Sequence, residues 1–208
     1  MSIDLRCFTY VNILQPQTAG FLGTISAGDP PLEGDSALFI EVSPGMGINN
    51  VTDIALKSTA VKPGLMIVER RYGALELHHE SQGQIVEAGE TILKQLGVER
   101  TERLKPRIVS EQTLTGIEGY QAQLVNKMRH GNFLHENDTL YILEVHPAGY
   151  ALLATNEAEK AANINVLEFR TIGAFGRIYL GGSEANIEEA AKAALYALSQ
   201  IEGRPNEP

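Results

Sequence analysis

The sequence has little cysteine, few basic side chains and no long apolar run, and each shortage excludes a class of protein. Cys7 is the single cysteine among 208 residues, so it cannot form an internal disulfide and has no companion for a cysteine-based metal or redox site. The longest apolar runs, such as 37–40 and 65–68, fall far short of the roughly 20 residues that cross a bilayer. We therefore expect no membrane span, and we interpret Cys7 as a small strand residue.

Positive charge is also scarce, because 17 lysines and arginines face 26 acidic residues and leave a formal net charge of -9. This balance opposes nonspecific contact with phosphate backbones, so nucleic acid is not an expected partner. Asp4 and Arg6 fall where a signal peptide would need its apolar segment. We therefore expect the protein to stay in the cytoplasm.

A repeat with a constant spacing of 103 residues fills nearly the whole chain. Glu-Val-Ser-Pro at 41–44 returns as Glu-Val-His-Pro at 144–147, and Tyr72-Gly73 returns as Phe175-Gly176. The same spacing relates Ala19 to Ala122, Gly28 to Gly131, Asp35 to Asp138, Lys57 to Lys160 and Leu77 to Leu180. Such self-similarity is typical of a duplicated domain. We predict one domain at 1–103 and a second at 104–208.

Both copies predict the same order of elements: a strand, a short helix, a strand, a helix, two strands and a final helix. Pro44 and Pro147 terminate the central strand of each copy, and the charged stretch 98–103 before Pro106 is the expected linker. Strands are expected at 5–12, 37–42, 65–68, 73–79, 107–114 and 140–145, and helices after Pro16, around 48–55 and 85–96, and at 118–128, 151–162 and 187–201. This pattern predicts an α/β class, as an α+β sandwich whose sheets are covered by helices.

Three patterns that often mark enzymes are present only in part. His78 and His79 are adjacent, but neighbours on a strand point to opposite faces and do not easily chelate one ion, so no metal is expected. His146 and Asp138 lack a Ser or Cys nucleophile on a strand-to-helix elbow. The glycines at 45–47 and 181–182 lack the residues of a phosphate or dinucleotide loop, and we interpret them as turns. We therefore expect no enzyme activity and no cofactor.

Two features stand out because the copies either agree or differ there. Lys57 and Lys160 occupy equivalent helix ends, where a lysine ordinarily complements the helix dipole. Glu69 and Arg70 belong to a charged run at 68–71 whose partner at 171–174 is Thr-Ile-Gly-Ala. A charged run is usually a solvated loop. A cluster present in one copy only, however, is not demanded by the shared fold, which suggests a specific role.

The strand and helix that follow one another in each copy resemble bacterial microcompartment shell domains. The motifs are Ile-Leu-Glu-Val at 142–145 with Ala-Glu-Lys-Ala-Ala-Asn-Ile at 158–164, and Phe-Ile-Glu-Val at 39–42 with Ala-Leu-Lys-Ser at 55–58. In ordinary members the glutamate strand opens the domain, whereas here a strand and a helix precede it. This order is similar to the circularly permuted, tandem-domain subclass, and the segments 14–17, 41–46, 66–70 and 173–177 resemble its carboxysome members.

The resemblance implies a homotrimer whose six domains form a pseudo-hexameric tile beside hexameric shell proteins in the carboxysome shell, possible stacking of two trimers, and a large gated central pore. It places Glu69 and Arg70 at the pore and Lys57 and Lys160 at the tile edges. Arginines at the rim would favour small anionic metabolites such as bicarbonate and phosphorylated sugars. The alternative from another class is a trimeric small-molecule sensor without a shell role, and an enzyme comes third.

Overall fold

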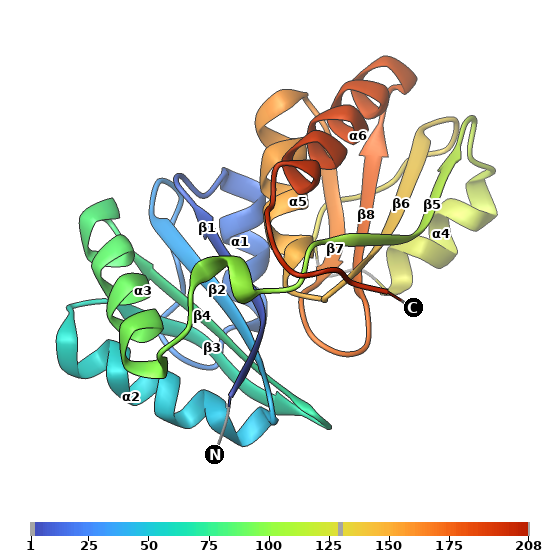
Figure 1. Cartoon of the computed structure of the whole chain (residues 1–208). Coiled ribbons are helices and arrows are strands. Elements are labelled where there is room, and N and C mark those ends of the chain that lie inside the picture. Colours follow the sequence, from blue (N-terminus) through green and yellow to red (C-terminus); the bar gives the residue numbers. More distant parts are fainter. Residues whose placement is uncertain (1–2, 129–130, 208) are drawn as a thin grey trace. The chain divides into compact units, whose positions relative to one another are not determined.

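The computed structural model describes residues 3–128 and 131–207, which form two compact units. One unit contains the chain up to Lys105 together with the residues from Ile201 onward, and the other is Pro106–Gln200. Each unit is an antiparallel four-stranded sheet with three α-helices (Figure 1). The expected α/β class and the tandem duplication are therefore confirmed.

The first unit has the sheet order β1-β2-β4-β3. Pro16 begins α1, because its fixed φ suits the first helical position and its missing N–H costs nothing there. Gly97, in the left-handed region at φ 68°, ends α3 by donating its N–H to the last turn. The elements are β1 (Asp4–Val11), α1 (Pro16–Ile25), β2 (Ser36–Ser43), α2 (Ile48–Ser58), β3 (Lys62–Glu69), β4 (Tyr72–His79) and α3 (Gln82–Leu96).

The second unit repeats this order as β5-β6-β8-β7. One expectation is wrong here: Gly181 and Gly182 are not a turn but the end of β8, because they pair with Leu140 and Thr139 of β6. The glycines at 45–47 form a single 3₁₀ turn before α2. The elements are β5 (Arg107–Leu114), α4 (Gly119–Met128), β6 (Thr139–His146), α5 (Tyr150–Ala161), β7 (Asn165–Arg170), β8 (Gly176–Gly182) and α6 (Glu184–Ser199).

One face of each sheet is covered by two helices that lie side by side, α2 with α3 and α5 with α6 (Figure 1). In the first unit, Ile40 and Leu75 of the sheet pack in one buried cluster with Val51 of α2 and Ile92 of α3. All four side chains are fully buried, and each such side chain stabilises the fold by about 1.5–3 kcal/mol. The periodic apolar positions seen in the sequence therefore form this core.

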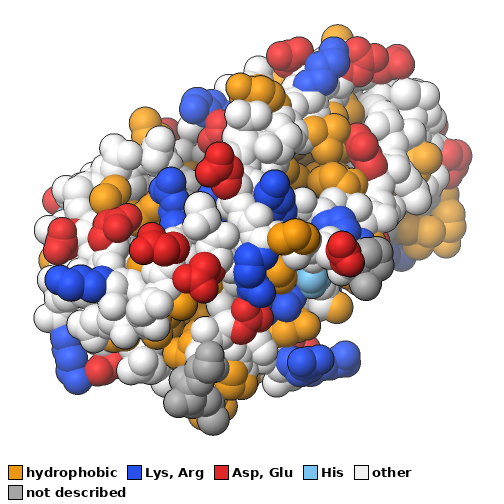
Figure 2. All heavy atoms as spheres, in the orientation of Figure 1, with side chains coloured by type: hydrophobic (Ala, Val, Ile, Leu, Met, Phe, Trp, Pro, Cys, Tyr) orange, Lys and Arg blue, Asp and Glu red, His pale blue; other side chains and the backbone are white. Residues whose placement is uncertain are grey.

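The remaining helix of each unit, α1 or α4, is packed to a different degree. Phe21 and Leu22 of α1 are buried. In the second unit, Ala122 of α4 packs in a small buried cluster, but Leu124 is 45% exposed and Tyr120 is 63% exposed. Figure 2 shows hydrophobic side chains gathered where α4 lies, whereas acidic and basic groups are interspersed over the rest of the displayed face. The second copy therefore closes this face of its sheet less completely.

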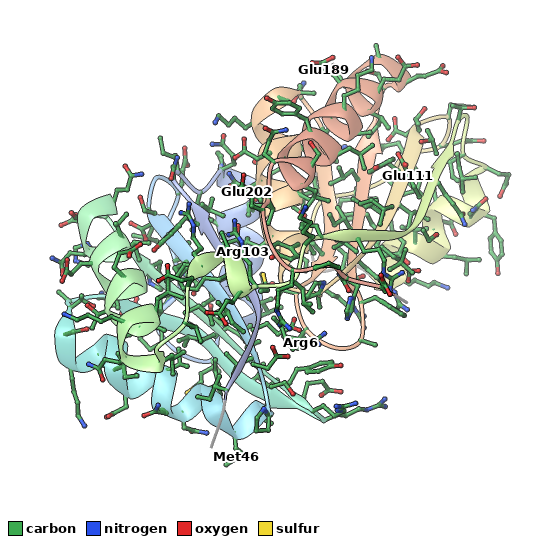
Figure 3. The ribbon with its side chains drawn as sticks, viewed as in Figure 1. Arg6, Met46, Arg103, Glu111, Glu189 and Glu202 are labelled. Atoms are coloured by element: carbon green, nitrogen blue, oxygen red, sulfur yellow. The ribbon has the colours of Figure 1, made fainter. Side chains whose placement is uncertain are left out.

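The last residues of the chain pair with the linker of the first unit. Arg103 donates from Nε to the Glu202 carbonyl at 2.8 Å, and Figure 3 shows these two residues on adjacent segments. Arg204 forms a parallel bridge with Leu104, and its guanidinium donates to Asp4 and to backbone carbonyls of the first unit. These bonds explain why the residues from 201 onward group with the first unit, whereas the sequence repeat placed them with the second.

Within the described ranges, 3–128 and 131–207, no helix combines the length and the apolar character that a membrane span needs.

Candidate functional site at the sheet hairpins

The hairpin between β3 and β4 carries the two residues that the sequence singled out for a pore. Glu69 ends β3 and pairs with Tyr72 of β4, so Arg70 and Arg71 form the turn. Arg70 has a φ of 53°, a region that residues other than glycine seldom adopt, and its side chain is 90% exposed. Its Nε lies 3.7 Å from Oε1 of Glu69, so the structure brings the predicted pair together in a loose, solvated ion pair.

The base of this hairpin is held much more tightly than its tip. Arg6 of β1 donates from Nε to Glu41 Oε1 at 2.7 Å, and both side chains are almost fully buried. The Arg6 guanidinium also lies 3.7 Å from the centre of the Tyr72 ring, a cation–π contact. At Gly73, an added Cβ would lie 2.2 Å from the Gly45 carbonyl oxygen, so the close approach requires glycine. A loose tip therefore stands on a rigid base.

The equivalent hairpin of the second copy, between β7 and β8, has a turn without charge at 171–175. Gly173 there has a φ of 105°. The charges lie at the base instead, where Arg170 and Arg177 are direct cross-strand partners. Arg177 donates to Glu144 and Arg170 donates to Glu168, each from Nε at 2.6 Å. The hydrogen bond that Arg177 donates to Glu144 raises the pKa of Arg177.

The two copies therefore keep one glutamate and change its arginine. Glu41 and Glu144 are equivalent, but the partner is Arg6 from β1 in the first copy and Arg177 from β8 in the second. The positions equivalent to these arginines hold Val109 and Ala74. Neither pair was predicted from the sequence, although a glutamate that returns on an apolar strand in both copies is a signal for a charged partner.

Lys57 and Lys160 lie in the last turns of α2 and α5, where the sequence placed them. Lys57 Nζ is 2.7 Å from Asp53, and Lys160 Nζ is 3.5 Å from Glu157. Both lysine side chains are more than half exposed, so these within-helix pairs contribute little to stability. Both ammonium groups are accessible from solvent at equivalent positions of the two units.

The adjacent histidines have separate environments, as the strand geometry predicted. His78 is buried with Nδ1 at 3.2 Å from the carboxylate of Glu76, whereas His79 accepts a hydrogen bond from the Ser81 amide. Burial raises the pKa of Glu76, which also accepts the Gly64 amide. Among the residues that the structure describes, no group of three or more potential ligands is placed to hold a metal ion.

The catalytic alternative at His146 has no geometric support. The His146 ring packs edge-on against Phe175, with centroids 6.1 Å apart. Asp138 instead accepts the amide of His135 at 2.8 Å and lies 3.3 Å from Nδ1 of that residue. His146 and Asp138 therefore take part in two different local contacts.

Comparison with known proteins points to one family. The carboxysome shell protein CcmP of Synechococcus elongatus is 48% identical over 204 residues, which cover 98% of this chain and 96% of that protein. The carboxysome shell protein CsoS1D of Prochlorococcus marinus is 44% identical over 200 residues, covering 96% of this chain and 78% of that protein. The family model of the CsoS1D N-terminal domain matches residues 5–102.

Solved structures agree with this result. The fused permuted hexameric shell protein MSM0275 from the RMM microcompartment has a TM-score of 0.94 at 43% identity, covering 97% of this chain and 99% of that one. The double ringed trimeric shell protein MSM0271 from the same microcompartment also has a TM-score of 0.94, at 36% identity, covering 98% and 100%. These relatives are shell proteins rather than enzymes, and the chain belongs to the carboxysome shell proteins of the tandem-domain CsoS1D and CcmP family.

Proposed function

We propose that three copies of this chain form a pseudo-hexameric tile of the carboxysome shell, and that Glu69 and Arg70 line a gated central pore. The observation that carries the gate is the β3–β4 turn. This turn has an exposed ion pair, and the backbone of Arg70 is in the left-handed region. The equivalent turn of the other copy is uncharged. Backbone strain of this kind concentrates at functional sites. The full-length similarity to shell proteins supports the tile.

The weakness of the Glu69–Arg70 pair suits a gate. A solvated ion pair contributes about 0–1 kcal/mol, so breaking three of them around a three-fold axis costs little. Two side-chain arrangements of similar energy then coexist, and small changes in conditions shift their populations. The rigid base formed by Arg6, Glu41 and Tyr72 keeps this motion in the side chains of the turn.

The three copies of Arg70 give the pore its preference for anions. Arg70 in the turn, repeated three times around the axis, attracts small anions such as bicarbonate and phosphorylated sugars relative to neutral gases. The trimer is expected to tile beside hexameric shell proteins through Lys57 and Lys160, and the exposure of both side chains supports this. The similarity to MSM0271, a double ringed trimeric shell protein, supports stacking of two trimers.

The gate is tested by comparing wild type with Glu69→Ala/Arg70→Ala, using Arg71→Ala as the matched control in the same turn. We expect a trimer or a stacked pair in sedimentation for all three proteins. Crystal structures should show a closed or mixed axis in wild type and an axis that no longer closes in the double variant. A stable monomer would refute the trimer, and a wild-type axis lined by other residues would refute the gate.

The tile edges are tested separately with Lys57→Asp/Lys160→Asp. Electron microscopy of the wild type should show sheets of hexagonal tiles, and the variant should remain trimeric without forming sheets. If the variant still forms sheets, the two lysines only complement their helix ends.

A further inference from the structure

The second unit has a cavity that lies between α4 and the edge of its sheet formed by β7 and β8. Its volume is about 260 Å³. Three apolar side chains form part of its wall, and two arginines, a glutamate and a tyrosine form another part. These residues are Leu124, Val125, Leu167, Glu168, Arg170, Arg177 and Tyr179. All of these residues belong to the second unit.

The first unit fills the equivalent region with its own side chains. Phe21 and Leu22 stand where the second copy has Leu124 and Val125, and their side chains are 3% and 1% exposed. Leu124, by contrast, is 45% exposed. The two arginine positions correspond to Ile67 and Ala74 in the first copy. The two arginines therefore occur in one copy only, beside a cavity whose counterpart positions in the first copy carry buried side chains.

The arrangement of the arginines leaves further donors for an anion. Arg170 and Arg177 are directly opposite on β7 and β8, and a carboxylate of Glu168 or Glu144 compensates the charge of each. Glu168 and Glu144 hold the two Nε atoms at 2.6 Å and thereby fix the guanidinium planes. An anion between the two side chains would meet the Nη donors, in the geometry that suits a carboxylate.

The walls restrict which anion fits. The side chains of Leu124, Val125 and Leu167 offer no hydrogen bonds to a hydroxylated ligand. A carbon skeleton that packs against them is favoured, because its apolar surface is removed from water. The volume lies just below the range of about 300–1,000 Å³ usual for drug-sized ligands, so the ligand must be small. Tyr179 adds one hydroxyl that can donate to a second polar atom.

We infer that this cavity is a binding site for a small organic carboxylate with an apolar body, held between Arg170 and Arg177. The inference goes beyond the pore, because the site lies at the base of the uncharged hairpin and uses none of Glu69, Arg70 or the lysines. A site of this kind gives the second copy a ligand-binding role that depends on arginines which the first copy replaces with Ile67 and Ala74.

The test uses the full-length wild-type protein with benzoate as the probe. Benzoate binding is measured by isothermal titration calorimetry and by the chemical shift changes of the Leu124 and Leu167 methyl groups. Acetate supplies the carboxylate without the apolar body, benzamide supplies the body without the charge, and inorganic phosphate tests for charge alone. We expect benzoate to bind at least tenfold more tightly than each of the other three. Equal binding of phosphate and benzoate, or no benzoate binding to wild type, would overturn the inference.

Two variants locate the site, and one serves as a control. Arg170→Gln removes one half of the anion fork, and Leu124→Phe places in the second copy the residue that fills the first copy while keeping every charge. We expect each to weaken benzoate binding at least tenfold and Arg71→Gln, in the other unit, to leave it unchanged. Circular dichroism confirms that each variant is folded. Wild-type affinity in both cavity variants would place the ligand elsewhere, whether or not the pore and the trimer are correct.

Discussion

The two units share one topology but use the face beneath α1 and α4 differently. In the first unit this face is closed by Phe21 and Leu22, and Glu41, the glutamate that both copies share, is buried with Arg6. In the second unit Leu124 is half exposed, a cavity opens beside it, and the equivalent Glu144 pairs with Arg177 near the surface. The duplication therefore preserved the backbone and the helix-covered core, and it allowed the other face to diverge.

The largest difference in stability between the two copies is expected when the arginine partner of each glutamate is removed. Arg6→Ala leaves Glu41 buried without its ion-pair partner, and such a loss costs about 3–5 kcal/mol of unfolding free energy. Arg177→Ala breaks a pair whose side chains are 47% and 24% exposed, so the expected cost is about 1 kcal/mol or less. Urea unfolding measures both. Equal costs would show that the burial difference does not matter.

A compensating variant sharpens this contrast. Arg6→Met combined with Glu41→Leu removes both charges and fills the space with apolar groups, so most of the lost stability should return. If the double variant is as unstable as Arg6→Ala, then the packing of the guanidinium on Tyr72, rather than the unpaired charge, dominates.

A second prediction concerns a constraint that the copies share. A Cβ at Gly73 would lie 2.2 Å from the Gly45 carbonyl oxygen, and one at Gly176 would lie 2.3 Å from the Ala148 carbonyl oxygen. Gly73→Ala and Gly176→Ala should therefore each cost about 1–3 kcal/mol, with similar values. Thermal unfolding of the two variants is the measurement, and Gly20→Ala, where a Cβ meets nothing within 4 Å, is the control.

The third prediction tests the terminal segment, which belongs to one unit only. Arg204→Ala removes the side-chain hydrogen bonds to Asp4 and to the Leu5 and Glu102 carbonyls, and a loss of about 1–2 kcal/mol is expected in the first unit. Hydrogen exchange should show faster opening of β1 with little change in β6. Uniform changes in both units would contradict the assignment of this segment to the first.

The smallest expected effect is a dependence of stability on pH that comes from Glu76. Tyr179 takes the equivalent place in the second copy. Burial raises the pKa of Glu76 above its ordinary value of 4.5. Its stabilising contribution is therefore complete below pH 4.5 and declines as the pH rises through the pKa that Glu76 has in the folded protein. Glu76→Gln stays neutral at every pH, so the melting temperature of the variant relative to wild type should be higher at pH 8 than at pH 4.

The control for this prediction is Glu87→Gln on the exposed side of α3. It changes the same formal charge without the burial, and the difference in melting temperature from wild type should not vary with pH. A Glu76→Gln variant whose difference from wild type is constant, or larger at pH 4, would show that contact with His78 outweighs burial.

Much of the fold followed from the sequence because it rests on local periodicity and on the repeat. The strands and helices appeared close to their predicted places, and Pro44 and Pro147 do follow the strands that they were expected to end. Residues 181–182 were misassigned because two glycines carry no strand signal of their own, and only pairing with β6 makes them a strand.

The site was predictable only where the copies differ visibly along the chain. The charges of Glu69 and Arg70 stand out against an uncharged partner segment, and the structure places them together. The ion pairs at Glu41 and Glu144, and the cavity beside Arg170, depend on neighbours across strands or on a different element. Glu41 and Glu144 each bond to an arginine that is more than 30 residues away in sequence. The periodicity of a single segment holds no information about such contacts.

The bond between Asp4 and Arg204 also has a practical consequence for attaching other molecules to the protein. It ties the start of β1 to the segment that follows α6, and both belong to the first unit. A peptide or enzyme fused close to Asp4 would therefore also disturb the segment around Arg204. A fusion partner that is to leave this contact intact can instead be inserted at the exposed turn around Gly34.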